Sequence, residues 1–226
     1  MTLDEAIRAR RSVRGYRPQP VPEATLREVF ALAQWSPSNC NIQPWVPHVV
    51  SGARLDALRD DLVAAARAGE PMTPDFEARA SYPGRYRDRQ VDAARRLYGA
   101  MGVARDDRAG RDAAYLRNQA AFGAPHAVFV FMHEPFGARE ATDVGMWAQS
   151  LMLAMTSRGM ASCAQGALGL YPPVVRRHLG LDESHRLMFG IAFGYEDPTV
   201  AANDARTDRV PLDEAVVFHG NMPGAA

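Results

Sequence analysis

The sequence predicts a single domain of the α+β class, in which long helices are interleaved with a few short strands. The chain has 226 residues, which is a little more than the ~100 to 200 residues typical of one domain. Its hydrophobic share of 47% and its charged share of 23% lie near the averages of globular proteins. Helical periods of apolar residues alternate with short β-rich runs, and no internal repeat is present.

Two helices are predicted in the amino-terminal part of the chain. Thr2 and Glu5 have the spacing of a capping box, so a short helix begins at Thr2 and runs into the basic segment at residues 10–14. Prolines at positions 18, 20 and 22 then interrupt regular structure. Pro22 suits the first turn of a second helix, which ends at residues 36–37.

The middle of the chain is predicted to contain a strand at residues 45–50 and an amphipathic helix at residues 52–68. Residues 69–112 are rich in Arg, Asp, Ala, Tyr, Gly and Pro, and they have helical character only around residues 90–101. Because this is the least core-like part of the chain, we expect a surface excursion.

The carboxyl-terminal half contains the most apolar helix. Residues 142–158 are apolar nearly all round, and Gly159 is a natural carboxyl-terminal cap. Such a helix is either the central core helix or much of a subunit interface. The other elements predicted here are strands at residues 127–133, 161–165, 187–193 and 215–218, and a short helix at residues 172–179.

The composition excludes several kinds of chemistry. The 26 Lys and Arg residues are all arginine, so no Schiff-base lysine, pyridoxal phosphate site, P-loop lysine or biotinyl attachment site is possible. Codon bias is an alternative reason for the missing lysine, but the exclusions hold either way. A net charge of +0 gives no overall attraction to nucleic acid or anionic membrane, and we expect neither partner.

The compartment and the metal content are also expected from the sequence. The first residues include acids and no apolar stretch, and no apolar run reaches the ~20 residues of a membrane span. Cys40 and Cys163 form no CxxC pair, which fits two reduced thiols in a cytoplasmic protein. The six histidines have no ligand-like spacing, so no metal site is expected.

No motif for a protein-borne nucleophile, acid or base is present: GxSxG, HExxH and GxGxxG are all missing. Two polar clusters stand out instead. Residues 10–14, RRSVR, place three guanidinium groups and one hydroxyl where they can grip a phosphate. Residues 36–45, SPSNCNIQPW, offer amides that suit the alternating donor and acceptor edge of a heterocycle, such as a flavin pyrimidine. A solvated basic face and an ordinary loop are the plainer alternatives.

The two clusters together, followed by the apolar helix, CAQGALG and NDARTDRVPLDEAV, resemble the FMN-dependent nitroreductase family from Thr2 to about His219. The resemblance implies a mixed, mainly antiparallel sheet flanked by helices. It also implies an intertwined homodimer with FMN at the subunit interface and the helix around Trp147 as the dimer core.

The resemblance implies which residues hold the FMN phosphate and the flavin ring. Arg10, Ser12 and Arg209 match phosphate-binding positions, and Arg11 lies in the same loop. Arg14 matches a basic residue that reaches the pyrimidine oxygen of the flavin. Many relatives have lysine at this position and at position 207, where this chain has threonine with an arginine beside it.

The resemblance also implies contacts from the partner subunit and at flavin N5. Pro37, Ser38 and Asn39 match the loop contributed by the other subunit, and Asn41 matches the amide that pairs with the pyrimidine edge. Two residues match the turn beside the reactive N5 atom: Gln165 and Gly166. Many relatives have an acidic residue at the first position of this turn.

The expected function is that of an FMN-dependent oxidoreductase with no catalytic residue of its own. NADH or NADPH reduces FMN in a ping-pong cycle, and a small planar acceptor such as a nitroaromatic or a quinone then oxidises it. Residues 69–122 are expected to cover the site, and their aromatic residues either stack on the acceptor or pack internally.

Three other functions stay open from the sequence. One is a non-catalytic flavin-binding protein, and another is a family relative that uses FMN for flavin fragmentation or for dehydrogenation of enones or other substrates. The third is a nucleic-acid-associated protein with a basic arm at residues 8–17.

Overall fold

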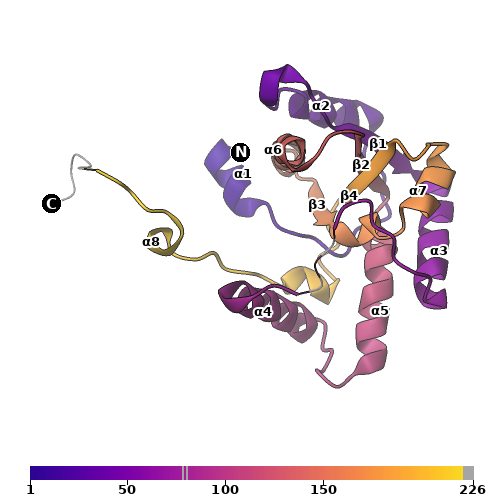
Figure 1. Ribbon diagram of the computed structural model, residues 1–226. Coiled ribbons are helices and arrows are strands. Elements are labelled where there is room, and N and C mark those ends of the chain that lie inside the picture. Colours follow the sequence, from indigo (N-terminus) through magenta and orange to yellow (C-terminus); the bar gives the residue numbers. More distant parts are fainter. Residues whose placement is uncertain (78, 80, 221–226) are drawn as a thin grey trace.

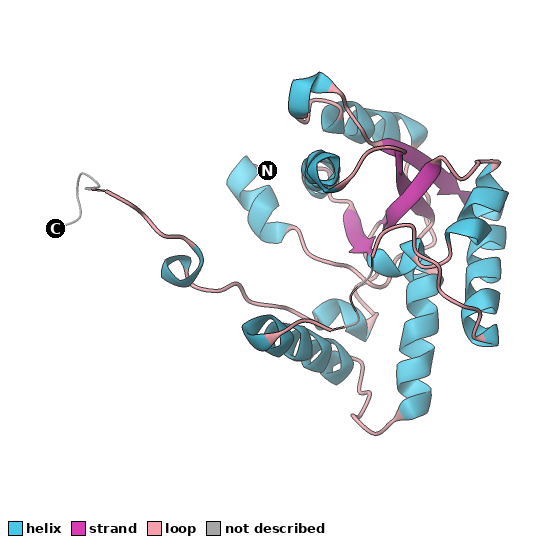
Figure 2. Ribbon diagram, in the orientation of Figure 1, coloured by secondary structure: helices cyan, strands magenta, loops and turns pink. Residues whose placement is uncertain are grey.

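The computed structural model describes residues 1–77, 79 and 81–220, in which helices surround a four-stranded sheet (Figures 1 and 2). The strand order is β1-β2-β4-β3, and each neighbouring pair is antiparallel. The strands are β1 Val46–Ser51, β2 His126–His133, β3 Ala161–Gln165 and β4 His185–Gly194. Parallel pairing in the described residues is limited to one isolated bridge between Ser12 and Ser162. The α+β prediction is therefore confirmed.

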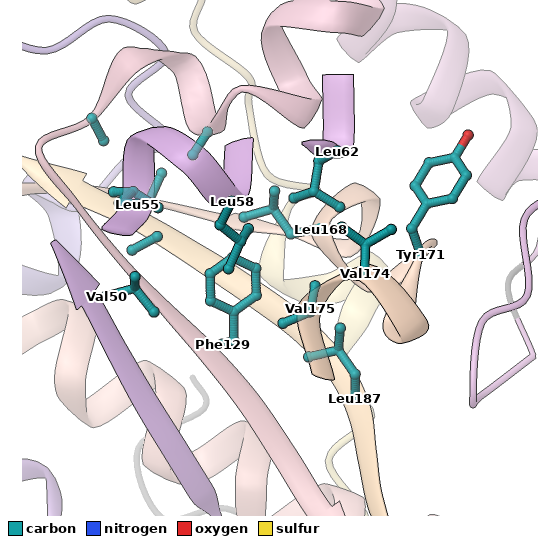
Figure 3. Close-up of a cluster of buried hydrophobic side chains, with 14 of the residues drawn as sticks. Val50, Leu55, Leu58, Leu62, Phe129, Leu168, Tyr171, Val174, Val175 and Leu187 are labelled. Carbon is teal, nitrogen blue, oxygen red and sulfur yellow. The ribbon is translucent and has the colours of Figure 1, made fainter. Parts of the chain in front are cut away.

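The central strand β2 separates two apolar cores because its side chains alternate between the faces of the sheet. Phe129 and Phe131 belong to the first core, under α3 Gly52–Ala68 and α7 Pro172–Leu179. Figure 3 shows leucines of α3 packed over Phe129 in this core. Val128 and Val130 point to the second core, under α2 Glu23–Ala33 and α6 Ala138–Thr156.

Helix α6 is a core helix within one chain. Trp147 is fully buried on it and stacks on Trp45, with the ring centroids 6.3 Å apart. The helix begins four residues earlier than predicted, at Ala138, because the Glu140 carboxylate accepts the Gly137 N–H at 2.8 Å and caps the first turn. The apolar pattern does not indicate this earlier start, because the first turn of α6 is polar.

The excursion between β1 and β2 contains more helix than predicted. Helix α4 spans Gly84–Ala100, and α5 follows at Arg108–Gln119. Helix α5 is not predicted from the sequence because its twelve residues include few large apolar side chains, so the apolar period is weak. In Figure 1 these two helices form the lower part of the molecule.

The first helix packs against α6, and the last part of the chain passes α4. Helix α1, Leu3–Ala9, has the predicted capping box, with both hydrogen bonds between Thr2 and Glu5 present. After the short helix η4, Ala201–Asp204, the chain passes α4 and leaves the body as an extended arm (Figure 1). The described residues contain no helix that is long and apolar enough to span a membrane.

The predicted strand at residues 215–218 is wrong. Helix α8, Leu212–Ala215, occupies its start, and the chain after it has no regular structure. The β-prone side chains lack a neighbouring strand in this chain, and a strand without a ladder leaves its backbone groups unpaired. Within the described residues, the remaining short helices are η1 Asn39–Asn41, η2 Ala121–Gly123 and η3 Gly166–Gly169.

Candidate functional site

The basic segment at residues 10–14 runs in an extended conformation beside the edge strand β3. Arg10 caps the carboxyl end of α1 with φ −58° and ψ 123°, so the helix ends there. The Val13 N–H then donates to the Ser162 carbonyl at 3.1 Å. In an extended chain successive side chains point to opposite sides. Val13 points into the core, and Ser12 and Arg14 therefore face away from it.

A large cavity of about 710 Å³ lies beside this segment. The walls come from α1, the basic segment, α4 and the start of the carboxyl-terminal arm. The described residues that line it include four of the predicted phosphate and flavin ligands and one more from the arm: Arg10, Arg11, Ser12, Arg14 and Arg209. No Asp or Glu side chain is among its described lining residues. Residues far apart in the sequence thus converge on one positively charged cavity.

Arg10 and Arg209 share this cavity without a counter-charge. Burial lowers the pKa of the half-buried Arg10 guanidinium, and the positive charge of Arg209 lowers that pKa further. Arg209 donates to backbone carbonyls, including that of Asp208 at 3.0 Å. In the part of the chain that the structure describes, neither arginine forms an ion pair with a carboxylate. Two neighbouring uncompensated cations favour a bound anion.

Arg11 differs from its neighbours because its charge is balanced. Its guanidinium forms a partly buried ion pair with Glu196, which follows β4. Arg11 therefore lines the cavity and also ties the basic segment to the sheet. Among the three arginines of the motif, only Arg10 and Arg14 have no carboxylate partner in the described residues.

Arg14 lies between the large cavity and a smaller one of about 220 Å³. The Asn203 side chain accepts the Arg14 N–H at 2.6 Å, and the Arg117 guanidinium donates to the Arg14 carbonyl at 3.0 Å. Asn203 is itself buried and donates to the Gly15 carbonyl at 2.9 Å. Residues distant in the sequence thus hold both backbone groups of Arg14. These contacts fix Arg14 between the two cavities.

The small cavity has aromatic and cationic walls. Its lining combines three aromatic rings, two arginines and one amide with small and aliphatic residues. These rings and polar groups are Tyr98, Tyr115, Phe122, Arg14, Arg117 and Asn118. The aromatic rings suit a planar ligand, and the arginines suit one with negative charge.

The predicted N5 turn lies next to this small cavity. Gln165, the last residue of β3, is buried, and its Nε2 donates to the Asn118 carbonyl at 2.8 Å. Its Oε1 is buried without a hydrogen-bond partner. Gly166 begins η3 with open space on its side-chain face, since an added Cβ would meet no atom within 4 Å. The turn therefore combines a buried, partly unsatisfied amide with a glycine that has open space beside it.

The loop between α2 and β1 lies apart from both cavities. None of its predicted flavin-binding residues lines either of them: Pro37, Ser38, Asn39 and Asn41. The loop nevertheless has a defined geometry with hydrogen bonds of its own. Cys40, Asn41 and Gln43 have positive φ of 49°, 57° and 47°. The Ser38 Oγ accepts the Gln43 N–H at 2.9 Å. The buried Asp143 of α6 accepts the Asn39 N–H at 3.1 Å. The loop is thus an exposed polar segment with its own hydrogen bonds, and it lies outside both cavities.

Several residues that support the candidate site are not indicated by the sequence. Asn118, Arg117 and Asp143 act through contacts with residues more than 40 positions away, and no local pattern indicates them. Asn203 begins the NDARTDRV segment, so a signal for it was present. Its contact with Arg14 joins the first and last parts of the fold.

Comparisons with known proteins decide the family. A sequence model of the nitroreductase family matches residues 7–195. The chain belongs to the nitroreductase family. It is 44% identical to Nitroreductase NfnB of Mycolicibacterium smegmatis over 216 residues, which cover 95% of this chain and 92% of that protein. It is 32% identical to a 4-nitrobenzoate reductase of a Nocardioides species, with 96% of this chain and 89% of that protein covered.

A solved structure gives the same nitroreductase fold. The FMN-dependent nitroreductase NfnB from Mycobacterium smegmatis, in complex with NADPH, matches this structure with a TM-score of 0.93 and 42% sequence identity. The match covers 96% of this chain and 97% of that one. The nitroreductase fold that the sequence resemblance implied is thereby confirmed.

Proposed function

We propose that this chain is an FMN-dependent oxidoreductase that passes electrons from NADH or NADPH to a nitroaromatic, a quinone or a related planar acceptor. The observation that carries the proposal is the pair of uncompensated arginines, Arg10 and Arg209, on the 710 Å³ cavity. This cavity meets the aromatic small cavity at Arg14. A phosphate site connected to a planar site is what a flavin mononucleotide requires.

The residues present fit FMN. Arg10, Ser12 and Arg209 would hold its phosphate, because two guanidinium groups and a hydroxyl supply donors without a competing carboxylate. Arg14 would hold the flavin ring, with Gln165 and Gly166 at its N5 edge. Arg11 would support the same segment through its ion pair with Glu196. The loop residues Pro37, Ser38, Asn39 and Asn41 would reach the flavin of the partner subunit.

Bound FMN supplies the two-electron redox chemistry that this chain's own side chains lack. The contribution of the protein is electrostatic and steric. Arg14, whose backbone is held by Asn203 and Arg117, would supply a positive charge beside the pyrimidine and would stabilise negative charge on it. The aromatic walls and the 220 Å³ volume of the small cavity suit a small planar acceptor.

We further propose a homodimer with FMN at the subunit interface. Trp35 is 88% exposed, and the carboxyl-terminal arm exposes Val217 by 74% and Phe218 by 57%. Apolar side chains on an arm that leaves its own body need another surface to cover them. Removing residues 211–226 should convert the dimer to a monomer in light-scattering measurements. A dimer that survives this deletion would place the interface elsewhere.

We also propose a cytoplasmic location. Its support is that Cys40 and Cys163 are both free thiols, one exposed and one buried, as expected in a reducing compartment.

One spectroscopic experiment tests the proposed function. The purified protein should be yellow with bound FMN, anaerobic NADPH or NADH should bleach it, and a nitrobenzoate should restore the colour. Bleaching that fails in a yellow protein would support a non-catalytic flavin-binding protein. A colourless protein that takes up no added FMN would refute the proposal.

A further inference from the structure

A third cavity, which we name the α4–α5 hollow, lies outside the proposed FMN site. Its volume is about 640 Å³, and its walls are α4, the turn after it and the start of α5. Four arginines line it: Arg87, Arg95, Arg105 and Arg111. No Asp or Glu side chain is among its described lining residues. The proposed FMN site uses none of these arginines.

Two of the four arginines are already engaged by their own helix. Arg95 pairs with Asp92 at 2.6 Å, and Arg87 donates to the Gln90 Oε1 at 2.8 Å. The other two, Arg105 and Arg111, have no carboxylate partner in the described residues. The Arg111 NH1 donates to the Arg105 carbonyl at 3.2 Å, and its guanidinium lies over the Tyr98 ring, 5.7 Å from the centroid. This pair is an uncompensated cationic site.

The hollow adjoins the small cavity across one side chain. On α4, Leu97 faces the large and the small cavities, whereas Tyr98 lines both the small cavity and the α4–α5 hollow. Val91 and Ala94 lie on the same side of the helix as Tyr98 and line the hollow. The three cavities are therefore neighbours around one helix, with the small cavity in the middle.

We propose that the α4–α5 hollow binds the 2′-phosphate of the adenosine half of NADPH, so that Arg105 and Arg111 make the chain select NADPH over NADH. The proposal rests on the proposed function above. A dinucleotide donor has to place its nicotinamide beside the flavin, and its adenosine half then extends away from that point. The hollow lies directly beyond Tyr98 from the small cavity. The 2′-phosphate is the group that distinguishes NADPH from NADH, and arginine is well suited to accommodate it.

An anionic acceptor is a less suitable occupant of the hollow. The acceptor has to contact the flavin, and the small cavity with Arg14 and Arg117 already offers cations at that position. The hollow is separated from it by the Tyr98 ring. An anion-binding region on the far side of the Tyr98 ring suits the far end of a long ligand better than it suits a small aromatic molecule.

The test compares both donors in the dimeric, FMN-loaded enzyme. Arg105→Gln and Arg111→Gln should each lower kcat/KM for NADPH about tenfold or more, because each removes a charge-assisted contact with the phosphate. The value for NADH should stay within about twofold, since NADH does not make this contact. The matched control is Arg89→Gln, an exposed arginine of α4 that does not line the hollow. Equal losses with both donors, or a wild-type enzyme without preference for NADPH, would overturn the proposal.

A binding measurement separates this inference from the proposed function. Calorimetry should show that adenosine 2′,5′-bisphosphate binds the wild-type holoenzyme at least about tenfold more tightly than 5′-AMP, and that Arg105→Gln removes the difference. Equal binding of the two nucleotides would refute the α4–α5 hollow as the 2′-phosphate site even in an active enzyme. If the protein oxidises neither donor, the proposed function fails, whereas selective binding of the bisphosphate would still support the site.

Discussion

The two arginines that meet at the large cavity allow a direct test of the phosphate site. Arg10→Ala and Arg209→Ala each remove one guanidinium from a cavity wall without removing a partner of any carboxylate in the described residues. In the protein without FMN, the two charges repel each other and burial disfavours the charge of Arg10. Neither substitution should therefore lower the melting temperature of the FMN-free protein.

FMN affinity should respond in the opposite way. A hydrogen bond to a charged group contributes about 1.5 to 3 kcal/mol, which corresponds to a loss of affinity of about tenfold to about 150-fold. Arg10 is the more buried of the two, so its removal should give a loss near the upper end of this range. Arg209 is exposed to solvent, which screens its charge, so its removal should give a loss near the lower end.

Fluorescence titration of the FMN-free protein with FMN measures these losses. Arg17→Ala is the matched control, because Arg17 is an exposed arginine just after the basic segment that does not line the cavity. Unchanged FMN affinity in Arg10→Ala, or an equal loss in Arg17→Ala, would show that the phosphate does not lie between Arg10 and Arg209. A large drop in the melting temperature without FMN would show that the arginine is structural.

Three further predictions concern the scaffold around the site. Burial lowers the pKa of His126, so the unfolded chain binds more protons than the folded chain below pH ~6.5. The free energy of unfolding should therefore fall between pH 7 and pH 5. In denaturation curves at these two pH values, His126→Gln should make this fall smaller. Asp143→Ala should weaken FMN binding by freeing the loop after α2, whereas Asp143→Asn keeps an acceptor and should retain affinity in the same titration. Gly190→Ala puts a Cβ 2.5 Å from the Leu168 side chain and should cost about 1 to 3 kcal/mol in urea unfolding, whereas Gly166→Ala, in open space, should leave stability unchanged.

Helices and strands with a clear apolar period were predictable from the sequence. The predicted helix at residues 52–68 coincides with α3, because Leu55, Leu58 and Leu62 recur at helical spacing and Gly69 ends it in the left-handed conformation with φ 69°. The structure of residues 215–218 was not predictable in this way. Whether a β-prone segment forms a strand depends on a neighbouring strand, and the local sequence does not contain that information.

The residues of the candidate site were predictable from the sequence, but the contacts that join them to the rest of the fold were not. The motif around Arg10 indicated an anion site because several donors lie close together in sequence. The pairing of Arg11 with Glu196 joins residues 185 positions apart, and the Arg14 contact with Asn203 joins residues 189 positions apart. Such contacts follow from the folded topology, and no periodicity within a short segment predicts them.

The positions of the carboxylates therefore indicate candidate anion sites in this protein better than the positions of the arginines do. In a chain whose basic residues other than histidine are all arginine, a guanidinium group alone does not mark a site. Arg11 and Arg95 each form an ion pair with a carboxylate, and their charge is balanced. Arg10 and Arg105 each line a cavity without such a partner in the described residues. The charge of the half-buried Arg10 is costly unless an anion binds there, whereas the exposed Arg105 is an unpaired cation that water already solvates. We therefore propose phosphate sites where an unpaired arginine lines a cavity that has no carboxylate among its described lining residues.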